Sequence, residues 1–72
     1  MPDPVKDHAL TIGEQLAAIE DSIGQIAGRV MRAASTGRSG NLEIAIGQAS
    51  MLDDQVTALV VDLRRMRKAM RS

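Results

Sequence analysis

Residues 5–33 (VKDHALTIGEQLAAIEDSIGQIAGRVMRA) and residues 42–70 (LEIAIGQASMLDDQVTALVVDLRRMRKAM) carry the pattern that decides the fold. Apolar residues recur in both segments at alternating intervals of three and four positions. The first row comprises Val5, Ala9, Ile12, Leu16, Ile19, Ile23, Ile26, Val30 and Ala33, and the second comprises Leu42, Ala45, Ala49, Leu52, Val56, Leu59, Leu63, Met66 and Met70. This spacing is typical of α-helices that pack together along one apolar stripe.

The two stripes mirror each other about a short polar segment, STGRSGN, at residues 35–41. Each apolar residue of one stripe has a counterpart in the other, and the two residue numbers sum to 75, as for Leu16 and Leu59. Such symmetry indicates two helices folded back around a turn, because layers then meet at matching distances from it. We therefore expect an all-α fold, an antiparallel two-helix coiled-coil hairpin, in a single domain covering residues 1–72.

Capping residues mark the ends of the two helices. Asp3 is a good N-cap, and Pro4 suits a first helical position because its missing N–H is not needed there. Gly37 suits a left-handed C-cap. These signals predict helices at about residues 4–35 and 42–70, joined by a turn at about residues 36–41.

A single hairpin buries only one stripe of each helix, so we expect it to bury more surface against another chain. A second row of small and apolar residues runs beside the first stripe, and two apolar residues of the second helix fall on the same side. The residues predicted for self-association are Leu10, Gly13, Ala17, Gly24, Ala27, Met31, Ile46 and Val60. The expected result is a dimer of hairpins forming a four-helix bundle, with a higher closed oligomer as the alternative.

Glu20 and Asp53 fall on this predicted interface, where two carboxylates are costly unless paired or hydrated. One interpretation is a metal site at the centre of the bundle. Di-metal carboxylate bundles, however, use Glu-x-x-His motifs, which the chain lacks. We therefore predict an interface charge pair and no bound metal.

Arginines gather at two places and are candidates for binding an anion or a partner. One cluster is Arg64, Arg65, Arg67, Lys68 and Arg71, and a looser group is Arg29, Arg32 and Arg38. Phosphate groups are the ligands that such clusters favour. The alternative for both is a solvated set of charges that suits the end of a helix or of the hairpin. Ile44 and Met51 form a small apolar strip on the more polar side, where a partner helix could dock.

Composition argues against catalysis. The chain has no cysteine and no aromatic residue, and His8 is its single histidine, so no nucleophile–base pair or metal-ligand set is available. Nine basic residues balance nine acidic ones, and no apolar run approaches the roughly 20 residues that cross a bilayer. We expect a cytoplasmic protein that is not an enzyme, has no cofactor and does not bind a membrane.

The predicted function is a small protein-interaction module, an adaptor, inhibitor or assembly component, that binds itself and an unidentified protein. A second hypothesis is a protein that binds or sequesters nucleic acid or an anionic nucleotide through its arginine clusters. A third is a structural subunit of a larger phage or secretion assembly, whose small-residue face meets a different chain.

Overall fold

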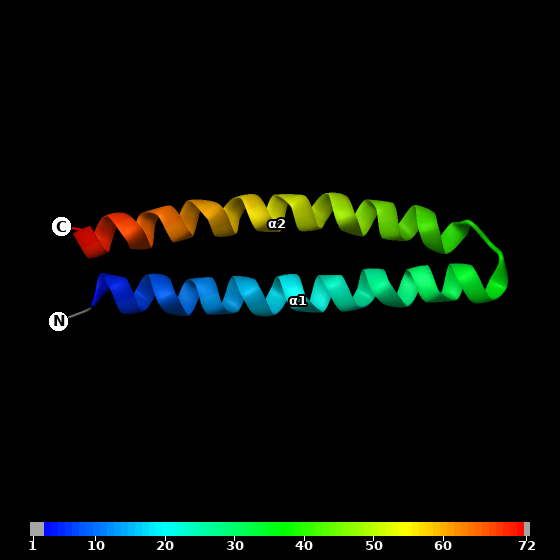
Figure 1. The fold of residues 1–72 in the computed structure, drawn as a ribbon, viewed down its shortest axis with the longest axis horizontal. Helices are drawn as coiled ribbons and strands as arrows, with labels where there is room; N and C mark the ends of the chain where they lie inside the picture. The colour runs from blue at the N-terminus through cyan, green and yellow to red at the C-terminus, as the bar shows by residue number, and fades with distance from the viewer. Residues whose placement is uncertain (1–2, 72) are drawn as a thin grey trace.

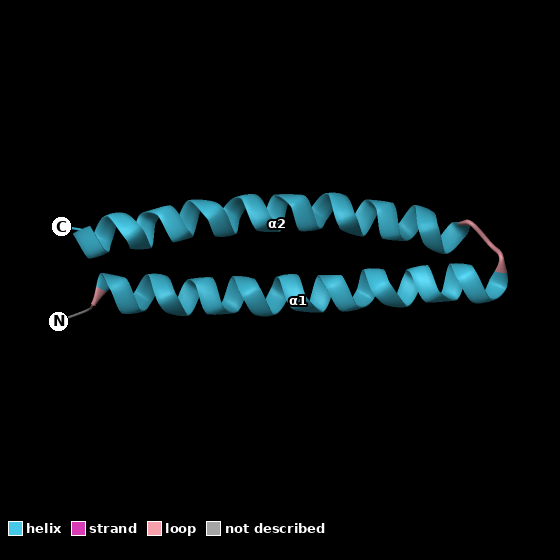
Figure 2. Ribbon diagram, in the orientation of Figure 1, coloured by secondary structure: helices cyan, strands magenta, loops and turns pink. Residues whose placement is uncertain are grey.

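The computed structural model describes residues 3–71 as two long helices, α1 (Pro4–Thr36) and α2 (Gly40–Arg71). The helices run antiparallel along each other, so both ends of the chain lie at one end of a rod and the turn lies at the other (Figure 1). The rod measures 55 × 16 × 13 Å. Within this part of the chain the secondary structure is helical with no strand (Figure 2), which confirms the prediction of an all-α hairpin.

The first helix begins where its capping residues predict. The side chain of Asp3 is the N-cap, and its Oδ1 accepts hydrogen bonds from the backbone N–H of Val5 at 3.0 Å and of Lys6 at 3.4 Å. These bonds satisfy two amides that have no partner within the helix. Pro4 follows as the first helical residue.

The turn is shorter than the sequence suggests, because α2 begins at Gly40 rather than near Leu42. Gly37 ends α1 in the left-handed region with φ 69°, and its N–H donates to the carbonyl of Ala33 at 2.9 Å. This backbone conformation favours glycine, which has no Cβ to clash. The backbone amides of Leu42 and Glu43 then donate to the carbonyl of Ser39, which closes the first turn of α2.

The buried and half-buried residues among residues 3–71 form one row on each helix, and we call these two rows the seam. The α1 row is Val5, His8, Ile12, Gln15, Ile19, Ser22, Ile26, Arg29 and Ala33, and the α2 row is Asn41, Ala45, Gln48, Leu52, Gln55, Leu59, Asp62, Met66 and Ala69. Apolar and polar positions alternate almost throughout both rows. Within residues 3–71 the most buried residues are Ile12, Ile19, Ala33 and Ala45, which keep 6–9% of their surface exposed.

The prediction that the whole of each apolar stripe packs against the other helix is wrong for every second residue. Ile19 keeps 9% of its surface exposed, but Ile23, one helical turn later, keeps 53%. Leu16, Val30 and Leu63 are likewise exposed. Each helix is rotated so that one edge of its apolar stripe, together with the polar row beside it, faces the partner helix.

Side-chain hydrogen bonds between the helices indicate their register. In the part of the rod away from the turn, Gln15 bonds Asp62 and Ser22 bonds Gln55, and both pairs of residue numbers sum to 77, two more than expected. To within one residue, this register places Ile12 level with Met66 and Ile19 level with Leu59. Apolar layers therefore alternate with polar layers along the rod.

Candidate interaction surfaces

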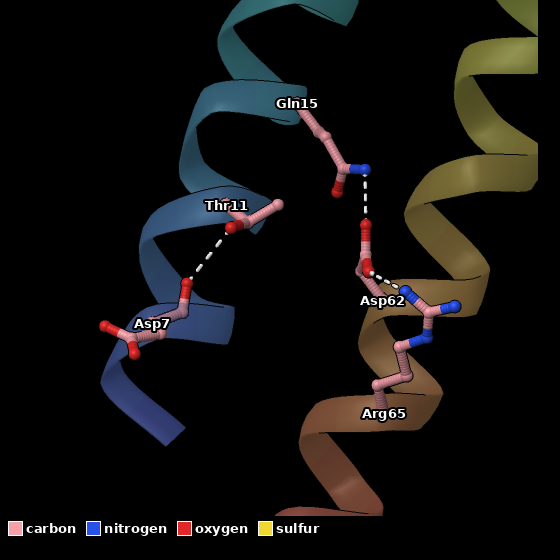
Figure 3. Close-up of polar contacts among 5 residues, drawn as sticks. All are labelled: Asp7, Thr11, Gln15, Asp62 and Arg65. Atoms are coloured by element: carbon pink, nitrogen blue, oxygen red, sulfur yellow. Dashed lines mark hydrogen bonds and ion pairs between the residues drawn. The ribbon is translucent and has the colours of Figure 1, made fainter. Parts of the chain in front are cut away.

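The polar half of the seam forms a chain of hydrogen bonds along one side of the hairpin, which we call the polar edge. Gln15 and Asp62 point toward each other from α1 and α2, and the Gln15 amide donates to the Asp62 carboxylate at 2.5 Å (Figure 3). Asp62 also forms an ion pair with Arg65 at 3.5 Å, one helical turn further along α2. This part-buried amide–carboxylate bond is more favourable than a neutral one because its acceptor is charged.

Three further bonds continue the polar edge toward the turn. The Ser22 hydroxyl donates to Gln55 Oε1 at 2.9 Å, and the Gln48 amide donates to Gln25 Oε1 at 3.1 Å. Arg29 then donates to Asn41 Oδ1 at 3.2 Å. Because hydrogen bonds require partners at a defined distance and angle, the part-buried pairs of this edge favour one alignment of the helices.

The opposite side of the hairpin carries the apolar residues that the seam leaves out. Except for Leu42, which follows the turn, each lies four residues beyond an apolar seam residue. Since the helices are antiparallel and both right-handed, that step carries both rows to the same side of the hairpin. We call these two rows the open apolar face: Ala9, Leu16, Ile23 and Val30 on α1, and Leu42, Ala49, Val56, Leu63 and Met70 on α2.

The residues predicted for self-association are all exposed and border the open apolar face. Gly13 and Ala27 lie next to it on α1, and Ile46 and Val60 lie next to it on α2. The remaining four form an outer row of α1: Leu10, Ala17, Gly24 and Met31. A Cβ added at Gly13 or Gly24 would meet no atom within 4 Å, so packing within the hairpin does not require these glycines. The space beside them is free for another helix.

A hollow interrupts the open apolar face at the turn. It has a volume of about 350 Å³ and is lined mainly by apolar or small residues of both helices. Its lining residues are Val30, Ala33, Ala34, Gly37, Arg38, Ser39 and Leu42. The hollow exists because alanine and glycine replace the larger side chains found further along the face.

Glu20 and Asp53 are both exposed and lie on the outer flanks of α1 and α2, with the open apolar face between them. Asp62–Arg65 is the ion pair found within residues 3–71, so neither Glu20 nor Asp53 forms one. The hairpin alone therefore gives neither carboxylate a basic partner. Their pairing with basic residues of another chain stays a prediction.

The basic cluster at the end of α2 is exposed and spread around the helix. Arg65 pairs with Asp62, whereas Arg64, Arg67, Lys68 and Arg71 make no ion pair with the described acidic residues. Asp3 and Asp7, which the antiparallel fold places at the same end of the rod, form no such pair with the cluster. These four cations are therefore free to meet an anion or a partner.

The second arginine group is divided by its contacts. Arg29 is half-buried and bonded to Asn41, whereas Arg32 and Arg38 are exposed. The hydroxyls of Ser35 and Thr36 donate to backbone carbonyls one turn back, so they are not directed at a ligand.

Arg29 and Arg32 border an open groove of about 710 Å³ along the outer side of α1, floored by Gly24 and Gly28. The same groove contains Glu20 and Asp21. Carboxylates and guanidinium groups are therefore mixed along its walls, an arrangement that does not select for an anion.

Ile44 and Met51 lie on α2 beyond the polar edge, on the side away from the open apolar face. Both are exposed, Met51 to 68%. They form a strip one helix wide, which is much smaller than the open apolar face.

Charge is segregated along the rod. Between Lys6 and Arg29 of α1, and between Arg38 and Arg64 of α2, the sequence has acidic residues but neither lysine nor arginine. The centre of the rod is therefore acidic, and both of its ends are basic. This acidic centre was not predicted, although the spacing of charged residues in the sequence is sufficient to find it.

The sequence predicted this side of the hairpin to be the more polar one, but not that its residues pair across the seam. A row of polar residues at seven-residue intervals, His8, Gln15, Ser22 and Arg29, accompanies the apolar stripe of α1. A matching row, Asn41, Gln48, Gln55 and Asp62, accompanies the stripe of α2.

No group of three or more histidine, cysteine, aspartate or glutamate side chains among residues 3–71 is placed to hold a metal ion. Over the same residues, neither helix combines the length and hydropathy needed to cross a bilayer. No protein-family model, curated protein or solved structure matches the chain.

Proposed function

We propose that this chain is a small protein-interaction module, an adaptor, inhibitor or assembly component, that acts as a homo-oligomeric helical bundle and catalyses no reaction. The observation that carries this proposal is the open apolar face. It runs the length of both helices, and its large side chains stay 41–66% exposed. Exposed patches of this extent on small proteins are typically interaction sites.

The two sides of the hairpin have different roles in this proposal. The open apolar face is hydrophobic enough to associate with another helical surface of the same kind. The other side, with the polar edge, Ile44, Met51 and Arg32, stays accessible in such a bundle. That side is the candidate surface for an outside protein.

The first experiment is the solution mass of the chain by light scattering behind a sizing column, for the wild type and for Val56→Glu. We expect the wild type to be a homo-oligomer. Val56→Glu should be monomeric and much less helical, because it places a charge at the middle of the apolar interface and an isolated hairpin buries few residues. Far-ultraviolet circular dichroism measures the helical content.

Val61→Glu is the matched control. Val56 and Val61 are exposed to 41% and 42%, but Val61 lies on the outward side of α2. The control should keep the mass and helicity of the wild type. A monomeric wild type would contradict the proposal and favour a structural subunit whose apolar face meets a different chain.

Anion binding through the basic end of the rod is the second candidate function. It is favoured by four cations, Arg64, Arg67, Lys68 and Arg71, that lack an ion pair with any described carboxylate. A labelled single-stranded oligonucleotide tests it, by fluorescence anisotropy at low and high salt. Binding should weaken steeply with salt and be lost in Arg64→Glu/Arg67→Glu.

A further inference from the structure

We infer that the open apolar face is covered by a second copy of this chain in an antiparallel arrangement, with α1 packed against α1 and α2 against α2. A two-fold axis then crosses the interface near Glu20 of α1 and Val56 of α2. This inference rests on the proposed self-association and specifies its geometry. The turn of each hairpin lies beside the chain ends of the other.

The size of the face fits a second copy. Seven large apolar residues on the face are each about half exposed, which leaves on the order of 80–100 Å² apiece. With the flanking Ile46 and Val60, each hairpin offers roughly 800 Å², the area that each partner of a stable interface contributes.

Two stacked hairpins can be related by two-fold symmetry in two ways, and the outer rows of the helices distinguish them. A two-fold axis along the rod would place α1 against α2 of the copy. An axis across the rod places each helix against its own counterpart. The outer row of α1 is apolar or small (Leu10, Ala17, Gly24, Met31), whereas that of α2 is polar (Glu43, Ser50, Thr57, Arg64, Arg71).

The axis across the rod pairs like with like. On α1, Leu10 then lies opposite Met31 of the copy, and Ala17 lies opposite Gly24 of the copy. On α2, Glu43 lies opposite Arg71 of the copy, which pairs opposite charges. The axis along the rod would instead place the apolar outer row of α1 beside the polar outer row of α2.

A single two-fold axis relates α1 to α1 of the copy and α2 to α2 of the copy. The Ser22–Gln55 hydrogen bond places residues 20 and 57 at the same level of the rod. A two-fold axis at that level brings Val56 close to Val56 of the copy and Leu63 opposite Ala49 of the copy. These alignments hold to within about two residues, or 3 Å along the helix.

The hollow at the turn receives a side chain in this arrangement. Met70 is 66% exposed at the far end of α2, and the antiparallel copy places it opposite Leu42, at the edge of the hollow. A flexible methionine is suited to filling such an irregular space. In the parallel arrangement the two hollows would face each other and stay unfilled.

Charge supports the same orientation. In the parallel arrangement Lys6 would lie near Arg67 of the copy, Glu20 would lie near Asp53, and both basic chain ends would meet. The antiparallel arrangement separates the two basic clusters by most of the 55 Å length of the rod. It leaves one like-charged contact near the interface, between the two copies of Glu20 at the axis.

Disulfide cross-linking tests the arrangement directly, because the natural chain has no cysteine. Three single variants are prepared: Val56→Cys, Met70→Cys and Leu42→Cys. Circular dichroism and light scattering first establish that each is folded and keeps the mass of the wild type. Under mild oxidation Val56→Cys should link to itself, since the axis brings its two copies together. Met70→Cys alone should not, because its two copies lie about 40 Å apart.

Met70→Cys mixed and refolded with Leu42→Cys should give a mixed disulfide between the two variants. Val61→Cys is the control for random collision. The expected links should form on the order of a hundredfold faster than in this control, because the local concentration within a dimer is millimolar. Efficient self-linking of Met70→Cys would overturn the antiparallel arrangement while leaving self-association standing. A monomeric wild type would overturn both.

Discussion

The two sides of this hairpin differ in what they bury. At the seam, apolar residues such as Ile19 alternate with hydrogen-bonded polar pairs such as Gln15 and Asp62. The open apolar face has as many large apolar side chains as the seam and no polar ones, yet no part of residues 3–71 covers it. The more hydrophobic side is therefore not the one that joins the two helices.

This difference shows that hydrophobicity and pairing specificity are carried by different rows of the same helices. Apolar packing tolerates several rotations of one helix against the other, because contacts between methyl groups are not directional. Hydrogen bonds between Ser22 and Gln55, or between Gln15 and Asp62, require a particular rotation and register. The polar edge thus selects the hairpin, and the open apolar face is left for a further partner.

The largest effect should come from truncating a buried isoleucine of the seam, and an exposed isoleucine of the open apolar face is its control. Ile19→Ala should lower the free energy of unfolding by about 2–4 kcal/mol at every protein concentration, because Ile19 is buried within the hairpin. Ile23→Ala should have little effect on an isolated hairpin, where Ile23 is 53% exposed.

Urea unfolding at low and high protein concentration measures both variants. The effect of Ile23→Ala should grow with concentration as the oligomer forms. An effect of Ile23→Ala that is as large as that of Ile19→Ala in the monomer would show that both rows face the seam.

An intermediate effect is expected on replacing a polar layer by an apolar one. Gln15→Leu/Asp62→Leu should leave thermal stability unchanged or raise it by about 1 kcal/mol, because a part-buried polar pair contributes less than packed apolar side chains. It should also produce a mixture of masses, since a bond that selects the register is lost.

Gln15→Leu alone is the matched control for this layer, and it should be destabilising because Asp62 then loses its bond from α1. The melting temperature and the light-scattering mass measure the two properties separately. A double variant with one sharp mass would show that the polar edge does not select the assembly.

The smallest effect concerns charge at the proposed axis. Glu20→Gln should strengthen self-association about two- to fivefold at low salt, because like charges at short distance disfavour the dimer. The gain should disappear at about 0.5 M salt, where the repulsion is screened. Sedimentation equilibrium measures the dissociation constant.

Glu14→Gln removes the same charge from the outward side of α1 and is the control for Glu20→Gln. It should leave the dissociation constant nearly unchanged. Equal effects of the two variants would mean that the repulsion comes from all the acidic residues at the centre of the rod and not from Glu20 of a neighbouring copy.

Spacing was sufficient to predict the helices and their antiparallel course. Intervals of three and four recur without a break over residues 5–33 and 42–70, and one polar segment separates them, so no other secondary structure competes. Asp3 and Pro4 marked the start of α1 and Gly37 marked its end, because their preferences depend on local backbone geometry alone. The residues predicted for self-association are exposed. The open apolar face beside them was predicted to pack against the other helix of the same hairpin, but it is exposed as well.

The rotation of each helix, and with it the separation into a seam and an open apolar face, required the folded pair. Ile19 and Ile23 belong to one apolar stripe and are indistinguishable by type and spacing, yet one is buried and the other is exposed. Their difference depends on hydrogen bonds between residues about 30 to 50 positions apart, such as Ser22 with Gln55 and Gln15 with Asp62. Local periodicity describes which residues share a side of one helix, whereas the choice of which side meets the other helix is a property of both helices together.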